Sequence, residues 1–434
     1  MSSAPHAPAA TWSAADAERW LLSLELFGMH FGLERMQRLM AALGSPNEAF
    51  ASIHVVGTNG KSSTVRMTAA ILSEHGVRTG AYLSPHLVSF AERIRVDGAD
   101  VSPEAFAAAA RRAHDVAEII DRDLDPGDRV TQFEALTAAA YLHLAEAGVE
   151  VAVVEAGLGG RWDATNVIGA PTAVLTNIGL EHTRWLGSTV AEIAREKLAV
   201  LTRTHPPATL VLGADLHPDA AAEARVAAER QGARIVWSSA RADDLPADVE
   251  LLARGAFQRR NFAVACAAAR AHLGRELDPA AVRAAAASTA VPGRFEVRPD
   301  GEGELVIDGA HNGAGVAALV ESLPPLLAGR PLVAVVSVLE DKDAGSMLER
   351  LLGLCSGIVF TASANPRALA PEALAELAGE LPAHVTARVE QDPRRALGVA
   401  RQLAGPRGVV LATGSIYLVA DLARPAGAGR ASTL

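Results

Sequence analysis

The sequence predicts an α/β fold with two parallel sheets, and three features indicate it. Short apolar runs alternate with helical patterns along most of the chain. The runs are apolar throughout rather than at every second residue, which is typical of parallel strands that helices cover on both faces. A stretch rich in Gly, Pro and charged residues, 292–303, divides the runs into two series. With 434 residues, half of them apolar, the chain can fill more than one core.

The elements follow in order along the chain. The first series of strands is expected at 52–56, 150–155, 172–177, 208–213 and 233–237, and the second at 304–308, 332–338, 357–361 and 408–413. Helices are expected at 62–75, 103–120, 132–147, 190–201, 258–273, 313–323, 371–379 and 393–404. Because loops rich in Gly and Pro often separate domains, we expect one domain over 1–297 and a second over 298–434.

Composition and charge narrow the class of protein. The net charge of −10 argues against nucleic acid as a main partner, although a local basic cluster can still hold a small anionic substrate. No apolar run approaches the ~18 residues that span a bilayer, so we expect no membrane partner. The two cysteines, Cys266 and Cys355, lack the spacing of a metal site or a disulfide framework. This cysteine usage favours the reducing cytoplasm.

A glycine-bracketed loop, Gly57–Thr58–Asn59–Gly60–Lys61–Ser62–Ser63, follows the first apolar run and opens a helical pattern. In such a loop, backbone N–H groups and a helix N-terminus attract phosphate, the lysine neutralises it, and a hydroxyl can bind magnesium. The common pattern G-x-x-x-x-G-K-[ST] needs a glycine where this chain has Val55, so the loop is two residues shorter. The layout predicts an ATP-binding P-loop, and a coincidental glycine turn is the alternative.

Two further strand ends carry polar residues. Glu155 ends the run 151–154, and His182 follows the run 173–177. In open parallel sheets, ligands bind beyond the carboxyl ends of the strands, so both side chains are expected near the phosphate loop. A carboxylate and an imidazole beside a triphosphate are plausible magnesium ligands. Each residue alone has a structural alternative, a helix cap for Glu155 and a satisfied loop histidine for His182.

Lys197 has an unusual place in the predicted helix 190–201. It lies four residues after Ile193 and three after Ala194, within the apolar stripe of that helix. A lysine on an inward face must pair, reach solvent or lose its charge. A neutral amine beside a metal site can react with carbon dioxide to give an anionic carbamate ligand. Pairing with Glu192 or Glu196 is the alternative.

The second strand series has its own polar strand end, Asp308–Gly309–Ala310–His311–Asn312. An aspartate there can bind a ribose hydroxyl, and the histidine can reach phosphate. Arg294 lies at the predicted joint between the domains, where it can neutralise charge on a phosphoryl group.

In this order, the motifs resemble the folylpolyglutamate synthase / dihydrofolate synthase family of the Mur ligase superfamily. The resemblance spans nearly the whole chain. Two of its segments, Ser84–Pro85–His86–Leu87 and 155–166, are specific to the folate branch. The other matching segments are 32–35, 57–61, 92–95, 131–134, His182, 196–197, Asn261, 292–295, 308–312, 341–343 and 414–415.

The resemblance implies an ATP-binding N-terminal domain, a smaller Rossmann-like C-terminal domain, and an active site in the cleft between them. It implies two magnesium ions held by Ser84, Glu155, His182 and a carbamylated Lys197, with potassium as a further candidate ion. It also implies ATP contacts from the P-loop residues and from Asn261, Arg294, Asp308 and His311. Lys61, His182, Lys197 and Arg294 are the expected catalytic residues. The expected pterin or folate contacts are Ser84, Pro85, His86, Arg93, Thr131, Phe133 and Asp163.

Four departures from the family pattern point to a divergent subgroup. Ser62 stands where Gly or Thr is usual, Glu181 where Asp is usual, and Gly309 where Ala or Val is usual. Leu198–Ala199 replaces Ala-Gly after Lys197. None of these changes removes an expected ligand, so they bear on substrate preference more than on chemistry.

The implied activity is an ATP-dependent acid–amino-acid ligase, expected as a monomer. ATP phosphorylates the carboxylate of dihydropteroate or of a reduced folate, and the amino group of L-glutamate attacks the acyl phosphate. A monofunctional folylpolyglutamate synthase is one alternative. A ligase of UDP-linked cell-wall precursors is another, although only about 50 residues precede the phosphate loop, too few for the usual UDP-binding domain. A nucleotide-dependent switch and a folate-binding paralogue without turnover are the alternatives that are not enzymes.

Overall fold

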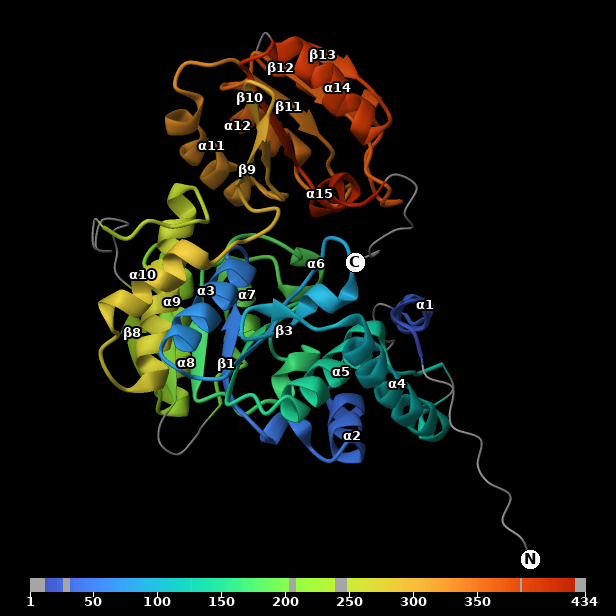
Figure 1. Ribbon diagram of the computed structural model, residues 1–434, viewed down its shortest axis with the longest axis vertical. Coiled ribbons are helices and arrows are strands. Elements are labelled where there is room, and N and C mark those ends of the chain that lie inside the picture. Colours follow the sequence, from blue (N-terminus) through green and yellow to red (C-terminus); the bar gives the residue numbers. More distant parts are fainter. Residues whose placement is uncertain are drawn as a thin grey trace, which may run out of the picture.

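The protein folds into two α/β domains, each built on its own sheet (Figure 1). The structure, a computed structural model, describes residues 12–25, 32–125, 127–202, 208–238, 248–382 and 385–425. In Figure 1 the N-terminal domain runs from blue to yellow, and the C-terminal domain, in orange and red, lies against one end of it.

The N-terminal domain holds an eight-stranded sheet that is parallel from β2 to β8. Two short antiparallel strands extend it beyond β2. From edge to edge its strands are β4 (Ala99–Asp100), β3 (Ile94–Val96), β2 (Thr79–Tyr82), β5 (Val151–Glu155), β1 (Ala51–Val56), β6 (Thr172–Leu175), β7 (Thr209–Leu212) and β8 (Arg234–Trp237). The strand β1, which leads into the phosphate loop, therefore lies between β5 and β6, whose ends carry the other predicted residues.

Helices cover both faces of this sheet. One face packs against α3 (Lys61–Glu74), α9 (Ala256–Leu273) and α10 (Pro279–Ser288) around Val55, Val153 and Phe262. The other face has two clusters. Around Tyr82 and Val154 lie α1 (Ala14–Ser23), α2 (Glu34–Ala42), α4 (Pro103–Ile120) and α5 (Gln132–Glu146). Around Leu175 and Leu212 lie α7 (Val190–Leu198) and α8 (Pro218–Gln231), with the short α6 (Thr183–Leu186) before them.

The C-terminal domain holds a six-stranded sheet in which only β9 is antiparallel. Its order is β13 (Thr386–Val389), β12 (Gly357–Phe360), β11 (Leu332–Val336), β14 (Val409–Thr413), β10 (Gly303–Ile307) and β9 (Glu296–Asp300). One face packs against α11 (Gly313–Leu327), α12 (Ala344–Leu352) and α13 (Pro371–Gly379), and the other against α14 (Pro393–Ala404) and α15 (Ile416–Ala423).

The expected strands and helices are confirmed to within a few residues at their ends, and the α/β class with two sheets is confirmed. The predicted domain boundary needs a correction. The interval 292–303 contains β9, whose residues Glu296 and Val297 pair with Ile307 and Val306 of the second sheet. A cut after residue 297 would therefore fall inside a strand. The strand escaped prediction because it carries Arg298–Pro299 on a half-exposed edge rather than an apolar run.

In the described residues, no helix is both long enough and apolar enough to cross a membrane.

Candidate active site

A cavity of about 440 Å³ lies where the two domains meet, at the carboxyl ends of the central strands. Both domains line it, the N-terminal one mainly through the loops after β1, β5 and β6, and the C-terminal one through the loop after β10 and the start of α11. The predicted residues that line it are Thr58, Asn59, Gly60, Lys61, Ser62, Ser63, Ser84, Pro85, Glu155, His182, Asn261, Arg294, Asp308 and His311. The predicted residues outside its lining are Gly57, His86, Arg93, Thr131, Phe133, Asp163 and Lys197.

The phosphate loop is fastened to the end of β6. The Thr58 N–H donates to the Asn177 carbonyl at 2.9 Å, and the Asn59 N–H donates to the Asn177 side-chain oxygen at 2.9 Å. Gly57 has φ 150°, and a Cβ there would collide with the Thr176 hydroxyl, so the loop needs glycine for this close approach. Gly57 packs against Thr176 of the neighbouring strand end and does not line the cavity.

Lys61 begins α3, so its side chain and the first N–H groups of a 14-residue helix face the same space. Its ammonium donates to the Gly57 and Thr58 carbonyls at 3.1 and 3.2 Å. These carbonyls hold the charge over the loop, where the helix N-terminus also favours an anion. The arrangement fits the binding of a phosphate.

Glu155 is buried at the end of β5 and faces the same cavity. One of its oxygens accepts from the Ser62 hydroxyl at 2.9 Å, and the other accepts from the Ser84 N–H at 3.1 Å. Burial raises the pKa of Glu155, while the charge of Lys61 and these two hydrogen bonds oppose the rise. A buried carboxylate beside a hydroxyl is chemically suited to bind a hard cation such as magnesium.

His182 lines the cavity from the loop after β6, in a left-handed conformation with φ 52°. Burial lowers its pKa to about 4, so the imidazole is neutral near pH 7 and has a lone pair for a ligand. The described residues contain no group of three or more His, Cys, Asp or Glu that could hold a metal. A magnesium ion at Glu155 would therefore take its other ligands from serine hydroxyls, the His182 nitrogen, substrate phosphates and water.

Lys197 is 5% exposed, on the inner face of α7. Burial, together with the nearby charge of Lys61, lowers its pKa to about 7. The two carboxylates that were alternatives for pairing are engaged elsewhere. Glu192 accepts N–H groups at the start of α7, and Glu196 pairs with Arg161 at 3.0 Å. The alternative in which Lys197 pairs with Glu192 or Glu196 is therefore wrong.

The C-terminal domain contributes Asp308 and Arg294. Asp308 accepts from the Phe295 and Ala310 N–H groups at 2.7 and 2.8 Å, and its burial raises its pKa. The Arg294 guanidinium donates to the Gly309 carbonyl at 3.1 Å. A Cβ at Gly309 would lie 2.8 Å from Arg294 Nη1, so the unusual glycine gives this arginine its room.

Three of the expected pterin contacts are engaged within the protein. Thr131 caps α5, accepting from the Glu134 N–H and donating to the Glu134 carboxylate at 2.9 Å. Asp163 accepts from the Leu158 N–H at 2.7 Å and from the Thr165 hydroxyl, and burial raises its pKa. Phe133 lies against Gly157, where a Cβ would be 2.7 Å from its ring. These contacts organise the loop after β5, and contact with a pterin stays a prediction.

His86 and Arg93 form a buried pair that does not line the cavity. Arg93 Nε donates to His86 Nδ1 at 2.9 Å, so that nitrogen carries no proton. The guanidinium of Arg93 also lies 5.4 Å from the Phe90 ring centroid. Arg93 is 1% exposed, and burial lowers its pKa. A substrate contact by either residue stays a prediction.

Several residues at the cleft were not given roles by the sequence. Asn177 shapes the phosphate loop, and Asn312 exchanges side-chain hydrogen bonds with Asn59 of that loop at 3.1 and 3.3 Å. Lys342, from the loop after β11, reaches Glu181 of the other domain at 3.2 Å. Their motifs are visible in the sequence, but nothing there shows that segments more than about 100 residues apart meet.

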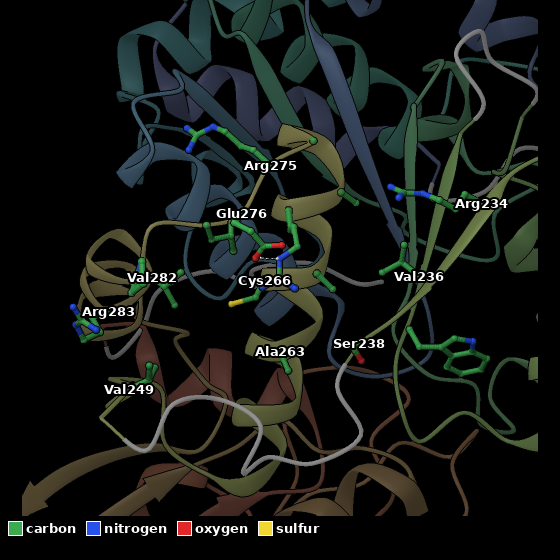
Figure 2. Close-up of a pocket in the computed structure, with 17 residues that line it drawn as sticks. Arg234, Val236, Ser238, Val249, Ala263, Cys266, Arg275, Glu276, Val282 and Arg283 are labelled. Carbon is green, nitrogen blue, oxygen red and sulfur yellow. Dashed lines mark ion pairs between the residues drawn. The ribbon is translucent and has the colours of Figure 1, made fainter.

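A second cavity, of about 550 Å³, lies between β8, α9 and α10 (Figure 2). Figure 2 shows Arg234 and Arg283 on opposite sides of it with Cys266 between them. Two of its arginines are already paired, Arg270 with Glu276 and Arg283 with Asp248, both at 3.2 Å. None of the predicted site residues lines it, so the candidate active site is the cavity between the domains.

Comparison with known families agrees with this arrangement. Residues 55–269 match the Mur ligase middle domain, and residues 293–416 match the Mur ligase glutamate ligase domain. The fold and the site therefore define an ATP-dependent ligase of the Mur type. Within that class, the chain belongs to the dihydrofolate synthase/folylpolyglutamate synthase family.

Named relatives cover nearly the whole chain. A dihydrofolate synthase/folylpolyglutamate synthase of Mycobacterium tuberculosis is 39% identical over 86% of this chain and 82% of its own length. A protein of the same name from Bacillus subtilis is 32% identical over 94% and 97%. The structure of M. tuberculosis folylpolyglutamate synthase complexed with ADP has a TM-score of 0.88 at 35% identity and covers 96% of this chain and 99% of its own. Escherichia coli FolC in complex with DHPP and ADP has a TM-score of 0.82 at 28% identity, over 96% and 98%.

Proposed function

We propose that this chain uses ATP to join L-glutamate both to dihydropteroate and to reduced folates. The observation that carries the proposal is the single cavity in which the phosphate loop, Glu155 and His182 of one domain face Arg294, Asp308 and His311 of the other. Relatives that bear both activity names, at 32% to 39% identity over most of the chain, support the dual activity. Thr131, Phe133 and Asp163 are the residues expected to admit the pterin.

The reaction needs two transfers in one enclosed space. The carboxylate oxygen of the acceptor attacks the γ-phosphorus of ATP, the bond to the β–γ bridging oxygen breaks, and ADP leaves. The glutamate nitrogen then attacks the acyl carbon, loses a proton, and expels phosphate. Lys61 would turn from the loop carbonyls toward the transferred phosphoryl group and spread its charge. Closure of the two domains would exclude water, which would otherwise hydrolyse the acyl phosphate.

Magnesium fits the residues at this site. Glu155 supplies a buried carboxylate without a cation in salt-bridge contact among the described residues, Ser62 and Ser84 add hydroxyls, and neutral His182 adds a nitrogen. The bound ions would polarise the phosphoryl oxygens and neutralise their charge. A neutral Lys197 amine would accept carbon dioxide, and the carbamate would serve the second ion. The buried position and lowered pKa of Lys197 support this role.

The test is ADP release from the purified protein with dihydropteroate or tetrahydrofolate, each with and without L-glutamate. ADP release that needs both a pterin acceptor and glutamate supports the proposal. ADP release with tetrahydrofolate and glutamate, but not with dihydropteroate and glutamate, would indicate a monofunctional folylpolyglutamate synthase. No release with either acceptor would overturn the proposal. Lys61→Ala should lower the rate roughly 100-fold or more. Glu74→Gln, at the exposed far end of the same helix, is the matched control.

The potassium requirement and the monomeric state can each be tested directly. A potassium requirement would appear as higher activity in potassium than in sodium buffer at equal ionic strength. A monomer would give the mass of one chain in sedimentation at micromolar concentration.

A further inference from the structure

Three polar side chains from three separate loops meet across the domain cleft. Glu181 follows β6 in the N-terminal domain, His311 follows β10, and Lys342 follows β11 in the C-terminal domain. The same carboxylate oxygen, Glu181 Oε1, lies 3.0 Å from His311 Nε2 and 3.2 Å from Lys342 Nζ. One N-terminal side chain therefore holds two loops of the C-terminal domain at once.

This cluster is largely closed to water. The side chains of Glu181 and Lys342 are 8% and 10% exposed, and that of His311 is 27% exposed. Burial acts to raise the pKa of Glu181, but the hydrogen bond and charge of His311, together with the charge of Lys342, lower it well below its usual value. A charge pair at this depth is screened less than a surface pair, so its loss is felt more strongly.

The segment that carries Glu181 is tied to the phosphate loop at its other end. Asn177 holds the Asn59 N–H, and the Gly179 N–H donates to the Thr58 hydroxyl at 3.0 Å. His182, which faces the cavity, is the next residue after Glu181. Residues 177–182 therefore connect the phosphate loop on one side with the C-terminal domain on the other.

We propose that Glu181 is a positioning residue that couples closure of the C-terminal domain to the placement of His182 and the phosphate loop. The proposal rests on the ligase function above and adds to it a residue outside the reacting groups. When Lys342 and His311 engage Glu181, the 177–182 segment is fixed between the two domains and the cavity is shut. When they disengage, the site opens to water while the nucleotide contacts of the phosphate loop persist.

The length of the Glu181 side chain matters for this role. An aspartate would withdraw the carboxylate by about 1.5 Å, the length of one C–C bond. Starting from 3.0 and 3.2 Å, neither His311 nor Lys342 would then stay within hydrogen-bond distance without movement of the loops. Glu181→Asp should therefore behave like a loss of the contact, although the charge is kept.

The experiment compares Glu181→Gln, Glu181→Asp and Lys342→Met with the wild type. The first measurement is the ratio of ADP released to amide formed, because an open site lets water hydrolyse the acyl phosphate. We expect a ratio near one for the wild type and clearly above one for all three variants, with kcat/KM for glutamate about tenfold lower. The dissociation constant for ATP should change less than twofold.

The control is Glu321→Gln, which removes a second pair between the domains, Arg260–Glu321 at 2.8 Å, where the side chain of Glu321 is 53% exposed. This variant should keep the wild-type ratio. A double variant, Glu181→Gln with Lys342→Met, should be no worse than Glu181→Gln alone, because that change already removes the ion pair with Lys342. Wild-type ratios in Glu181→Gln and Lys342→Met would overturn the proposal. A wild type without turnover would instead overturn the ligase function, so the two failures are distinguishable.

Discussion

Burial sets the charge of several polar residues in this protein. His182 and Lys197 lie in surroundings that favour the neutral form, with pKa values lowered by burial to about 4 and about 7. Burial also favours the neutral form of Glu155, because it raises the pKa of this carboxyl, while the charge of Lys61 opposes the rise. The sequence predicted the inward place of Lys197 from its spacing in the helix, but it could not show that both candidate carboxylates are engaged elsewhere.

The role of Lys197 can be tested through its dependence on pH. Lys197→Ala should lower kcat at least about tenfold, and a short carboxylic acid should restore part of it. In the wild type, activation by added bicarbonate should weaken as the pH falls through about 7, because the amine then becomes protonated. Arg195→Ala is the control, since Arg195 lies on the same helix but points outward to Glu223. Full activity of Lys197→Ala without added acid would contradict the carbamate.

His54 should make the protein sensitive to acid. It is fully buried in β1, its Nε2 lies 2.8 Å from the Thr165 hydroxyl, and burial lowers its pKa to about 3 from 6.5. Between these values the unfolded chain binds more protons than the folded one, so stability is lost as the pH falls below 6.5. At pH 5 the loss from this residue is about 2 kcal/mol. Urea unfolding of His54→Gln and wild type should therefore differ in how much stability each loses between pH 7.5 and 5, with the variant losing less.

At the level of elements, apolar runs and helical periodicity located the central strands and the long helices. Three of the missed elements lack those signals. β13 is exposed at all four residues, β4 has only two residues, and α10 is largely alanine, so its apolar stripe has little contrast. Such elements form because a neighbouring strand or helix offers hydrogen bonds and contacts, and these come from distant parts of the chain.

The phosphate loop gives a prediction at this scale. Gly57→Ala should displace the loop, because the new Cβ would collide with the Thr176 hydroxyl and the backbone has φ 150°. We expect ATP affinity to fall at least about tenfold, measured by calorimetry. Gly148→Ala is the matched control, because Gly148 has φ 67° with open space around it. That variant isolates backbone strain, which costs roughly 1–2 kcal/mol, and should leave ATP affinity unchanged.

At the scale of the whole molecule, function depends on two separately packed domains meeting correctly. Their cores are distinct, and the cavity draws its wall from both. The sequence indicated two domains and the residues at each strand end. It could not show which side chains cross the cleft, because Glu181 and Lys342 are 161 positions apart and no periodicity links them.

Nucleotide binding should stabilise the assembled molecule. ADP at about 100 times its dissociation constant should stabilise the wild type by about 2.7 kcal/mol and raise its melting temperature by several degrees. Lys61→Ala should lose most of this rise at the same ADP concentration, whereas Glu74→Gln should keep it. An equal rise in Lys61→Ala would show that the phosphate loop contributes little to nucleotide binding.

The amide pair Asn59–Asn312 has a consequence for how the cleft responds to its surroundings. Neither side chain carries a charge, so ionic strength and pH have little effect on this contact. The buried pair Glu181–Lys342 is screened only weakly by salt, whereas the exposed pair Arg260–Glu321 is screened more strongly. High salt should therefore weaken the contact between the domains at Arg260–Glu321, while the amide pair still holds the phosphate loop in register with the opposite domain.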